Sequence, residues 1–419
     1  MVSAAPSTSC CGWVADRFGT RTAFFCAIVV FVFGSALCAA ASTLRGLALS
    51  RIVQGAGGSM LLPVGRLVVL RNVPSERYLP ALAFVTIPGL VGPLIGPTAG
   101  GWLSEYYSWH WIFLINIPVG IVGAVVTLRV MPQTRGVRRE AVDAAGYSMI
   151  AIAMVAISLA LDGLAELHLQ HAVVVLLFIF GLTALSAYWP HAAQRPQPLF
   201  SPRLFRVATF SIGLLGNLFS RIGSGAVPFL LPLTLQVGLG YTPLQSGLMM
   251  VPAAIAAMLT KRPVTPLIMR HGYRKVLVIN TLLLGCAIAS LGLVSPGQPL
   301  WLRIIQFTLF GAVNSLQFTA MNTLTLKDLG TARACSGNSM LSMVQMVSMS
   351  FGVAAAAALL TTFTQMLAAV RPLQVLRAFH LSFVCAGTIT VAAAWVFSQL
   401  SNEVKSRGER AQQVDVAPS

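Results

Sequence analysis

The chain has 419 residues, of which 56% are hydrophobic and only 9% are charged, and its formal net charge is +17. About a quarter of the residues of a soluble globular domain are charged, so this composition excludes such a domain and indicates a protein that lies in lipid. An apolar stretch of about 20 residues crosses the ~30 Å hydrocarbon core of a bilayer. Twelve such stretches follow one another along the chain: 22–41, 46–70, 79–103, 109–131, 145–163, 171–190, 207–235, 243–266, 276–295, 299–325, 336–366 and 378–400.

The placement of the basic residues accounts for the net charge. If residues 12–21 are cytoplasmic, the loops on that side contain 22 of the 28 lysines and arginines, and the opposite loops contain four: Arg45, Arg303, Arg371 and Arg377. This asymmetry follows the positive-inside rule for multi-pass membrane proteins. We therefore expect the lipid bilayer to be a partner of the chain, both termini to be cytoplasmic, and nucleic acid not to be a partner.

Cysteine and histidine usage indicates neither a disulfide framework nor a metal site. Cys26, Cys38, Cys286 and Cys385 lie within apolar stretches, where cysteine usually acts as a small hydrophobic residue, and no CxxC occurs. The six histidines are scattered without metal-ligand spacing. The phosphate-binding pattern GxxxxGK[ST] is absent, and no nucleophile–base set is visible. We expect no metal, no cofactor, no ATP-driven transport and no enzymatic activity.

A run of glycines and prolines, PGLVGPLIGPTAGGWL from Pro88, interrupts the third apolar stretch. An internal proline costs about 3 kcal/mol in a soluble helix, whereas neighbouring helices in a bilayer can satisfy the freed backbone groups. Gly89, Gly92, Gly96 and Gly100 recur at steps of three and four, which places them on one helix face. We expect another backbone to approach this face closely.

Two longer polar loops, 132–144 and 191–206, divide the chain into three parts. Residues 1–131 hold the first four apolar stretches, residues 132–206 hold two linker helices with their flanking loops, and residues 207–419 hold six helices and a cytoplasmic tail. We predict these three parts as the organisation of the chain.

A faint internal repeat relates the two halves of the chain. DRFGTR at 16–21 precedes the first apolar stretch, and MRHGYR at 269–274 precedes the ninth, with the same Arg-x-Gly-x-Arg frame and an offset of 253. GAGGS at 55–59 is echoed by GAVNS at 311–315 with an offset of 256. Parallel six-helix repeats around a central cavity are typical of secondary transporters.

Four motifs resemble the major facilitator superfamily, specifically its fourteen-helix drug:proton antiporter branch. GWVADRFGTR at 12–21, the loop motif, resembles the family's loop signature between helices two and three. RIVQGAG at 51–57 resembles its helix-four arginine motif, and residues 92–101, the helix-five motif, resemble its antiporter motif. WHWIFLINIP at 109–118 is similar to the opening of helix six in the drug-efflux branch.

The resemblance implies an all-α integral membrane bundle of fourteen helices, of which about twelve are present here. The first two helices of the family would precede residue 12, so we expect an incomplete N-terminal bundle. The implied function is proton-coupled efflux of drug-like molecules across the bacterial inner membrane, with a small-molecule substrate and protons as partners.

The resemblance also implies roles for two sets of residues. The loop motif would act as a gate latch, the alternative being a loop that only sets topology; its candidate residues are Gly12, Asp16, Arg17, Gly19 and Arg21. The helix-five motif would let a bent helix rock against a partner, the alternative being static packing; its candidate residues are Gly92, Pro93, Gly96, Pro97, Gly100 and Gly101.

Ionisable residues within the apolar stretches are candidates for function, because they are costly in a bilayer. None of the eleven acidic residues lies in the middle of a stretch, so no proton-carrying carboxylate is evident. Arg51, with Gln54 one turn away, is predicted either to modulate a proton site or to be a structural arginine bonded to Gln54. Arg221 and Asn217 are predicted to line the cavity, where Arg221 binds an anionic substrate or pairs with a residue of the absent helices.

Two alternatives to drug efflux stay open. Two buried arginines without a buried acid suit an exporter of anionic metabolites such as organic acids. The second alternative is that the chain is a truncated membrane protein that does not transport. Polar side chains of the C-terminal helices could line a cavity in a transporter: Asn217, Gln236, Asn314, Gln317, Asn322, Asn338 and Gln345.

Overall fold

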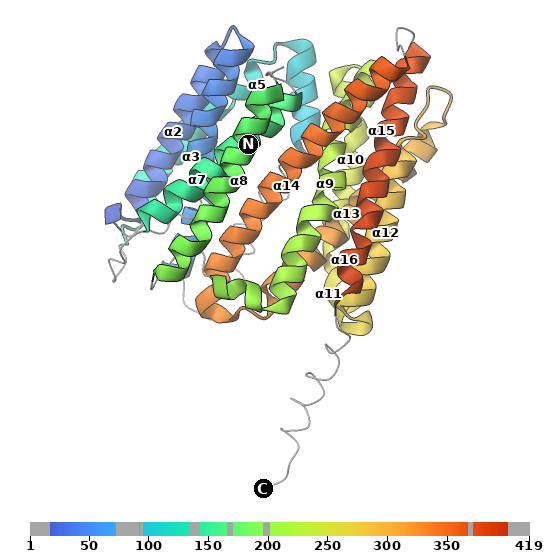
Figure 1. The fold of residues 1–419 in the computed structure, drawn as a ribbon. Coiled ribbons are helices and arrows are strands. Elements are labelled where there is room, and N and C mark those ends of the chain that lie inside the picture. Colours follow the sequence, from blue (N-terminus) through green and yellow to red (C-terminus); the bar gives the residue numbers. More distant parts are fainter. Residues whose placement is uncertain are drawn as a thin grey trace. The chain divides into compact units, whose positions relative to one another are not determined.

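The computed structural model describes residues 17–72, 92, 95–134, 143–165, 171–195, 202–367 and 372–400, and these are helical apart from short connections (Figure 1). The first half contains α2 (Thr20–Ala40), α3 (Leu44–Asn72), a helix over 95–106, α5 (Trp111–Leu114), α6 (Asn116–Val130), α7 (Ala144–Ala165) and α8 (His171–Gln194). The second half contains η2 (Pro202–Arg206), α9 (Ala208–Leu233), η3 (Thr234–Gly238), α10 (Pro243–Leu259), α11 (Lys261–His271), α12 (Tyr273–Leu291), α13 (Leu300–Lys327), α14 (Gly330–Met366), α15 (Pro372–Ala392) and α16 (Ala394–Ser398).

The prediction of an all-α membrane protein is confirmed. Eight helical segments of the described residues are long and apolar enough to cross a bilayer, and Ala145–Ala160 and Pro243–Leu259 are shorter apolar helices. Ten of the twelve predicted stretches coincide with helical segments, while the third, 79–103, lies largely outside the described residues. The stretch 243–266 is not one helix as predicted, because α10 ends at Leu259 and α11 begins at Lys261.

The chain divides into two compact units. The first comprises Met1–Pro202 together with Tyr241–Leu248, and the second comprises Arg203–Gly240 together with Met249–Ser419. In the first unit α2 packs against α3, α5 and α6, and α7 packs against α8. In the second unit α9 packs against α13, α14 and α15, and α12 packs against α13 and α15. The predicted three-part division at 132 and 207 stays a prediction.

Glycines allow α2 and α3 to approach at backbone distance. A Cβ on Gly34 of α2 would collide with the backbone of Gln54, and a Cβ on Gly57 of α3 would lie 2.7 Å from the carbonyl oxygen of Ala27. Gly57 belongs to the predicted arginine motif, so this glycine of the motif serves helix packing.

One glycine of the helix-five motif makes a close contact in the structure. A Cβ on Gly92, Gly96 or Gly100 would meet no described atom within 4 Å, so a close approach to the face that these glycines share stays a prediction. The contact instead uses Gly101, where a Cβ would collide with the carbonyl of Pro243 in α10. Gly101 is one position beyond Gly100, so it is turned by about 100° around the helix.

Pro97, one turn before Gly101, completes this contact from the other helix. A Cβ on Gly247 would collide with the Pro97 carbonyl, and it would lie 2.9 Å from the Cα of Thr98. The Thr98 hydroxyl donates a hydrogen bond to the Gly247 carbonyl at 3.4 Å. Pro97, Thr98, Gly101 and residues 241–248 all belong to the first unit.

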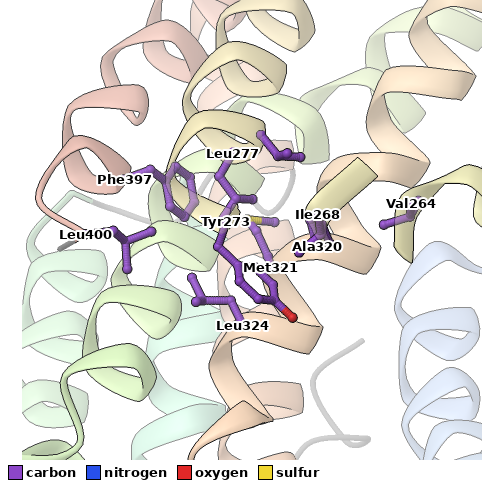
Figure 2. Close-up of a cluster of buried hydrophobic side chains, with 10 residues drawn as sticks. Val264, Ile268, Tyr273, Leu277, Ala320, Met321, Leu324, Phe397 and Leu400 are labelled. Atoms are coloured by element: carbon purple, nitrogen blue, oxygen red, sulfur yellow. The ribbon is translucent and has the colours of Figure 1, made fainter. Parts of the chain in front are cut away.

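A hydrophobic cluster joins α11, α12, α13 and the end of α16 in the second unit (Figure 2). Leu277, Ala320, Leu324 and Phe397 are fully buried at its centre. Its ten members are Val264, Ile268, Tyr273, Val276, Leu277, Ala320, Met321, Leu324, Phe397 and Leu400. The cluster fixes α12 and α13 against each other, and α13 carries part of the candidate site described below.

The faint sequence repeat has a counterpart in the backbone. Gly19 precedes α2 with φ 90° and ψ 151°, and Gly272 precedes α12 with φ 77° and ψ 157°. Both are the central glycine of the Arg-x-Gly-x-Arg frame. The two halves therefore start their first long helix after the repeated motif through the same glycine turn.

Candidate functional site

The described part of the loop motif forms the entry to α2. Gly12 and Asp16 lie outside the described residues. Arg17 is exposed, and its guanidinium lies 6.0 Å from the centroid of the Phe18 ring. Gly19 is buried and Arg21 is partly buried in the first turn of the helix. The proposed latch role of this motif stays a prediction.

The segment 132–134, which follows α6, is bonded to this entry. The Thr20 hydroxyl donates to the Pro132 carbonyl at 3.0 Å and lies 2.9 Å from the Thr134 hydroxyl. The Thr20 amide donates to the Thr134 carbonyl at 3.0 Å, and the Thr134 amide donates to the Thr20 hydroxyl at 3.2 Å. We call residues 132–134 the clamp segment, because it fixes the start of α2 to the end of α6.

Gln133 gives the clamp segment its contact with Gly19. Its Nε2 donates to the Phe18 carbonyl at 3.0 Å and to the Thr22 hydroxyl at 3.1 Å. A Cβ on Gly19 would collide with this amide. The glycine of the loop motif is therefore required twice, once for its positive φ and once for the space that Gln133 occupies.

Arg51 and Gln54 form a polar group between α2, α3 and α5. The Arg51 guanidinium donates to Gln54 Oε1 at 3.1 Å and lies 4.6 Å from the centroid of the Phe113 ring. Gln54 Nε2 donates to the Ser35 hydroxyl at 2.7 Å. Gln54 is 5% exposed, whereas Arg51 is exposed among the described residues, and its predicted role at a proton site stays a prediction. The guanidinium lies on the face of an aromatic ring, where a cation–π contact stabilises it at the surface.

Four residues of the helix-five motif, Gly96, Pro97, Gly100 and Gly101, lie on the helix over 95–106. Gly92 is also helical, and Pro93 lies outside the described residues. Gly92 and Gly96 are exposed, whereas Pro97 and Gly100 are partly buried and Gly101 is buried. Near the end of this helix Glu105 accepts a hydrogen bond from the Leu244 amide at 3.0 Å. A carboxylate at the first turn of α10 is in the favourable position for a helix N-terminus.

Three amide side chains meet inside the second unit and form what we call the amide cluster: Asn217 of α9, Asn322 of α13 and Gln345 of α14. Gln345 Nε2 donates to Asn217 Oδ1 at 3.1 Å and to Asn322 Oδ1 at 2.6 Å. Asn217 Nδ2 donates to the Gly213 carbonyl at 3.0 Å and lies 3.5 Å from the Thr325 hydroxyl. Asn217 is fully buried, and the other two amides are partly buried.

Arg221 lies one helical turn from Asn217 on the same face of α9. Its guanidinium carbon is 4.4 Å from the centroid of the Phe318 ring, and Phe318 lies one turn before Asn322 on α13. Arg221 Nε is buried, and no atom of the described residues accepts a hydrogen bond from it. Of the predicted cavity residues, the structure thus places Arg221 and Asn217 side by side, whereas Arg51 and Gln54 belong to the first unit.

A buried acid–base pair links the two linker helices. His191 Nε2 of α8 donates to Asp143 Oδ1 at 2.7 Å, and the Gly146 amide donates to the same oxygen at 3.0 Å. Burial alone raises the pKa of the Asp143 carboxyl. The hydrogen bonds from His191 and Gly146 and the nearby His191 and Arg195 outweigh this effect and bring the pKa below its ordinary value. Asp143 thereby acts as the N-cap of α7.

An arginine predicted in an outer loop has a structural role. Arg303 is 6% exposed, and its guanidinium donates to the carbonyls of Ser295, Pro296 and Gln298 at 3.2, 3.1 and 2.6 Å. The carbonyl of Val294 in the same loop lies 3.0 Å from His380 Nε2 of α15. These bonds close the connection between α12 and α13.

Sequence reasoning missed Gln133, Phe318 and the Asp143–His191 pair. Gln133 follows an apolar stretch as one polar residue among several, and Phe318 is one of 22 phenylalanines, so neither carries a signal of its own. Asp143 before an apolar stretch is a recognisable helix N-cap. Among the residues that the structure describes, no group of three His, Cys, Asp or Glu side chains could hold a metal ion.

Comparison with known families places these motifs in one superfamily. The sequence model of the Major Facilitator Superfamily matches residues 1–353 and, in a second match, residues 213–418. The chain is 47% identical over 389 residues to "Putative multidrug resistance protein MdtD" of Serratia proteamaculans (strain 568), which covers 93% of this chain and 81% of that protein. It is 48% identical over 354 residues to the protein of the same name from Pectobacterium atrosepticum, which covers 84% and 76%.

Solved transporter structures share the fold. A POT family transporter in complex with 5-aminolevulinic acid superposes with a TM-score of 0.67 at 18% identity, covering 94% of this chain and 85% of that one. A D-xylose-proton symporter superposes with a TM-score of 0.66 at 15% identity, covering 96% and 87%. At these identities the likeness concerns the fold alone.

Proposed function

The chain belongs to the Major Facilitator Superfamily, and from this membership we propose that it exports small, drug-like amphipathic molecules across the bacterial inner membrane. The observation that carries the proposal is the close identity, along most of the chain, to relatives named for multidrug resistance. The division of the chain into two compact helical units supports the proposal, because alternating access requires one helical unit to rock against another.

We infer that protons drive this export. The support is the likeness of the loop motif and the helix-five motif to the antiporter branch, together with the absence of GxxxxGK[ST] from the sequence. Glu105, Asp143 and Asp328 lie at helix ends, so none of these three carboxylates is a candidate for a mid-membrane proton acceptor. In this proposal Arg51, bonded to Gln54, modulates the proton site by its charge.

We propose that the loop motif and the helix-five motif have the gating roles that the resemblance to the family implies. The loop motif, anchored through Gly19 to the clamp segment, would bind and release neighbouring helices as the transporter changes state. The helix-five motif would move along its contact at Gly101 and Pro97.

We also propose that both termini lie in the cytoplasm. The support is the distribution of the 28 basic residues over alternate loops. Cysteine labelling from either side of right-side-out vesicles tests this orientation. Labels in 132–144 and 261–275 are expected on the same, cytoplasmic side, and labels on opposite sides would contradict the topology.

A second candidate function is export of anionic metabolites, and Arg221 favours it. The Phe318 ring lies 4.4 Å from its guanidinium carbon, and no described residue accepts a hydrogen bond from its buried Nε. A carboxylate substrate would supply the counter-charge that a cation inside a membrane protein requires.

Uptake into everted membrane vesicles, whose cytoplasmic face points outward, distinguishes these functions. Vesicles from cells with and without the protein are energised with a pH gradient, acidic inside, and supplied from outside with ethidium or with radiolabelled succinate. The leading proposal expects gradient-dependent transport of ethidium that a protonophore abolishes. Transport of succinate alone would contradict the leading proposal and favour export of anionic metabolites. Arg221→Ala should then abolish the transport of succinate. Transport of neither compound would contradict export and favour a non-transporting membrane protein.

A further inference from the structure

Arg221 carries a charge that no acidic residue of the neighbouring helices balances. It lies in α9, within the membrane span Ala208–Gly238. Helix α9 packs against α13, α14 and α15, and none of these four helices contains an aspartate or a glutamate. Among the described residues, nothing accepts a hydrogen bond from the buried Nε of Arg221. A charge without a counter-ion is costly within a membrane, so the contacts that stabilise it need an explanation.

The Phe318 ring of α13 covers one face of this guanidinium. The guanidinium carbon lies 4.4 Å from the centroid of the ring, which is within the range of a cation–π contact. In the first unit Arg51 also lies over a ring, that of Phe113, but it donates a hydrogen bond to Gln54 as well. Since the Nε of Arg221 has no such acceptor in the described part of the chain, the Phe318 ring carries more of the stabilisation.

Phe318 is the exposed member of this pair. It is 38% exposed, whereas Arg221 is partly buried. Asn322 lies one turn further along α13 and accepts a hydrogen bond from Gln345 of α14. Polar side chains in membrane-spanning helices avoid lipid and mark substrate pathways. Because Phe318 lies on the side of α13 that carries Asn322, a ligand that approaches this side meets the ring before it meets the guanidinium.

We propose that Phe318 is a specificity-determining residue whose ring shields the Arg221 charge, so that the substrate path accepts cationic and uncharged aromatic molecules. The face of the ring is electron-rich and stabilises the guanidinium, while the exposed part of the ring offers a ligand an apolar surface. Without the ring, the uncovered guanidinium would repel cations and attract anions. The proposal rests on the export function above, because it names the residue that sets the charge preference of the same protein.

Two ions of nearly the same shape and opposite charge test the shield: tetraphenylphosphonium and tetraphenylborate. Their binding to the purified full chain in detergent is measured by equilibrium dialysis, and the uptake by protein-free micelles is subtracted. In Phe318→Leu the Kd of the phosphonium should rise and that of the borate should fall. The ratio of the two constants should shift toward the anion by about tenfold, as expected for the loss of a partly desolvated cation–π contact. An unchanged ratio, or a wild type that does not bind tetraphenylphosphonium, would overturn the proposal.

The ratio distinguishes a shield from a packing residue, because a loss of packing alone would weaken both ions alike. Phe219→Leu is the matched control: Phe219 lies on α9, is 44% exposed, and takes part in none of the cation–π contacts of the described residues. The same substitution there should leave the ratio unchanged. Phe318→Tyr keeps the ring and should keep the ratio of the wild type.

A double variant shows whether the effect passes through Arg221. In an Arg221→Leu background, Phe318→Leu should change the ratio by less than about twofold, because the ring then has no charge to shield. A tenfold shift in that background would reject the shield. If Phe318→Leu does not elute as a single species, Phe318→Met, which also lacks the ring, replaces it in both backgrounds.

The outcome for the shield is independent of the outcome for export. Ethidium transport by the wild type, together with an unchanged ratio in Phe318→Leu, would leave export in place and reject the shield. A shifted ratio without ethidium transport by the wild type would support the shield and contradict export.

Discussion

Gly19 and Gly272, separated by 253 positions, hold the same backbone conformation, with φ 90° and ψ 151° at one and φ 77° and ψ 157° at the other. This region of φ and ψ is essentially restricted to glycine. Their surroundings differ: a Cβ at Gly19 would collide with Gln133, and a Cβ at Gly272 would meet no described atom within 4 Å. The pair therefore separates the conformational requirement from the packing requirement.

Substitution of the two glycines should have unequal effects on stability. Gly272→Ala should destabilise the protein by about 1–3 kcal/mol through backbone strain alone. Gly19→Ala should cost more, because the Gln133 amide must also move and lose its bonds to Phe18 and Thr22. The apparent melting temperatures of the purified variants in detergent measure this difference.

A double substitution isolates the role of Gln133. Gln133→Ala should recover part of the loss of Gly19→Ala and none of the loss of Gly272→Ala, as expected for residues that couple only when they touch. Additive losses for Gly19 and Gln133 would contradict their contact.

The adjacent glycines Gly100 and Gly101 provide a matched test of the helix-five contact. Gly101→Ala should lower stability by about 1–3 kcal/mol, because its methyl group would collide with the Pro243 carbonyl. Gly100→Ala should stay within about 0.5 kcal/mol of the wild type, because its methyl group meets no described atom within 4 Å. Thermal unfolding of both variants measures the effects. Equal losses would place the contact on the wrong face.

The Asp143–His191 pair should make stability depend on pH on the acid side. The pKa of Asp143 is lower in the folded protein than its ordinary value, so its contribution is present above the ordinary pKa and is lost as pH falls through the folded pKa. His191→Gln removes a lowering influence, so the acid loss of stability should begin at a higher pH. Melting temperatures between pH 3 and 7 test this expectation. Asp143→Asn should be less stable than the wild type at pH 7 and should converge with it at the acid end.

Arg303 should be the principal support of the connection between α12 and α13. Arg303→Met leaves three loop carbonyls without their donor and should cost about 2–3 kcal/mol. Arg303→Lys keeps the charge but not the planar fork of donors, so its loss should be intermediate. Unfolding in detergent measures both variants. A Met variant as stable as the wild type would show that the loop is held by other contacts.

Hydropathy predicted most helices, because the bilayer imposes a simple length and composition rule. The stretch 22–41 coincides with α2 almost to the residue, and 299–325 with α13. The interruption at Thr260 was missed, although Lys261, Arg262 and Pro263 follow one another directly after the apolar run and mark the break. The contact of Gly101 was not predicted, because the pattern of glycines at steps of three and four singled out Gly89, Gly92, Gly96 and Gly100 instead.

The candidate site was predicted in part. Arg221 and Asn217 stand out because polar residues are costly in apolar helices, and their spacing of four residues puts them on one face. Their meeting with Phe318, Asn322 and Gln345 depends on how α13 and α14 are rotated toward α9. That rotation is set by packing between segments about 100 residues apart, which the sequence pattern of one helix does not contain.

The paired threonines at positions 20 and 134 have a consequence for engineering. Three hydrogen bonds between them, and a fourth from Thr20 to Pro132, bring the start of α2 and the end of α6 together, so the polypeptide between them forms a closed loop whose ends meet. Segments with adjoining ends are suited to exchange as cassettes. Chimeras between relatives should therefore tolerate replacement of 17–134 as a block far better than crossovers inside it.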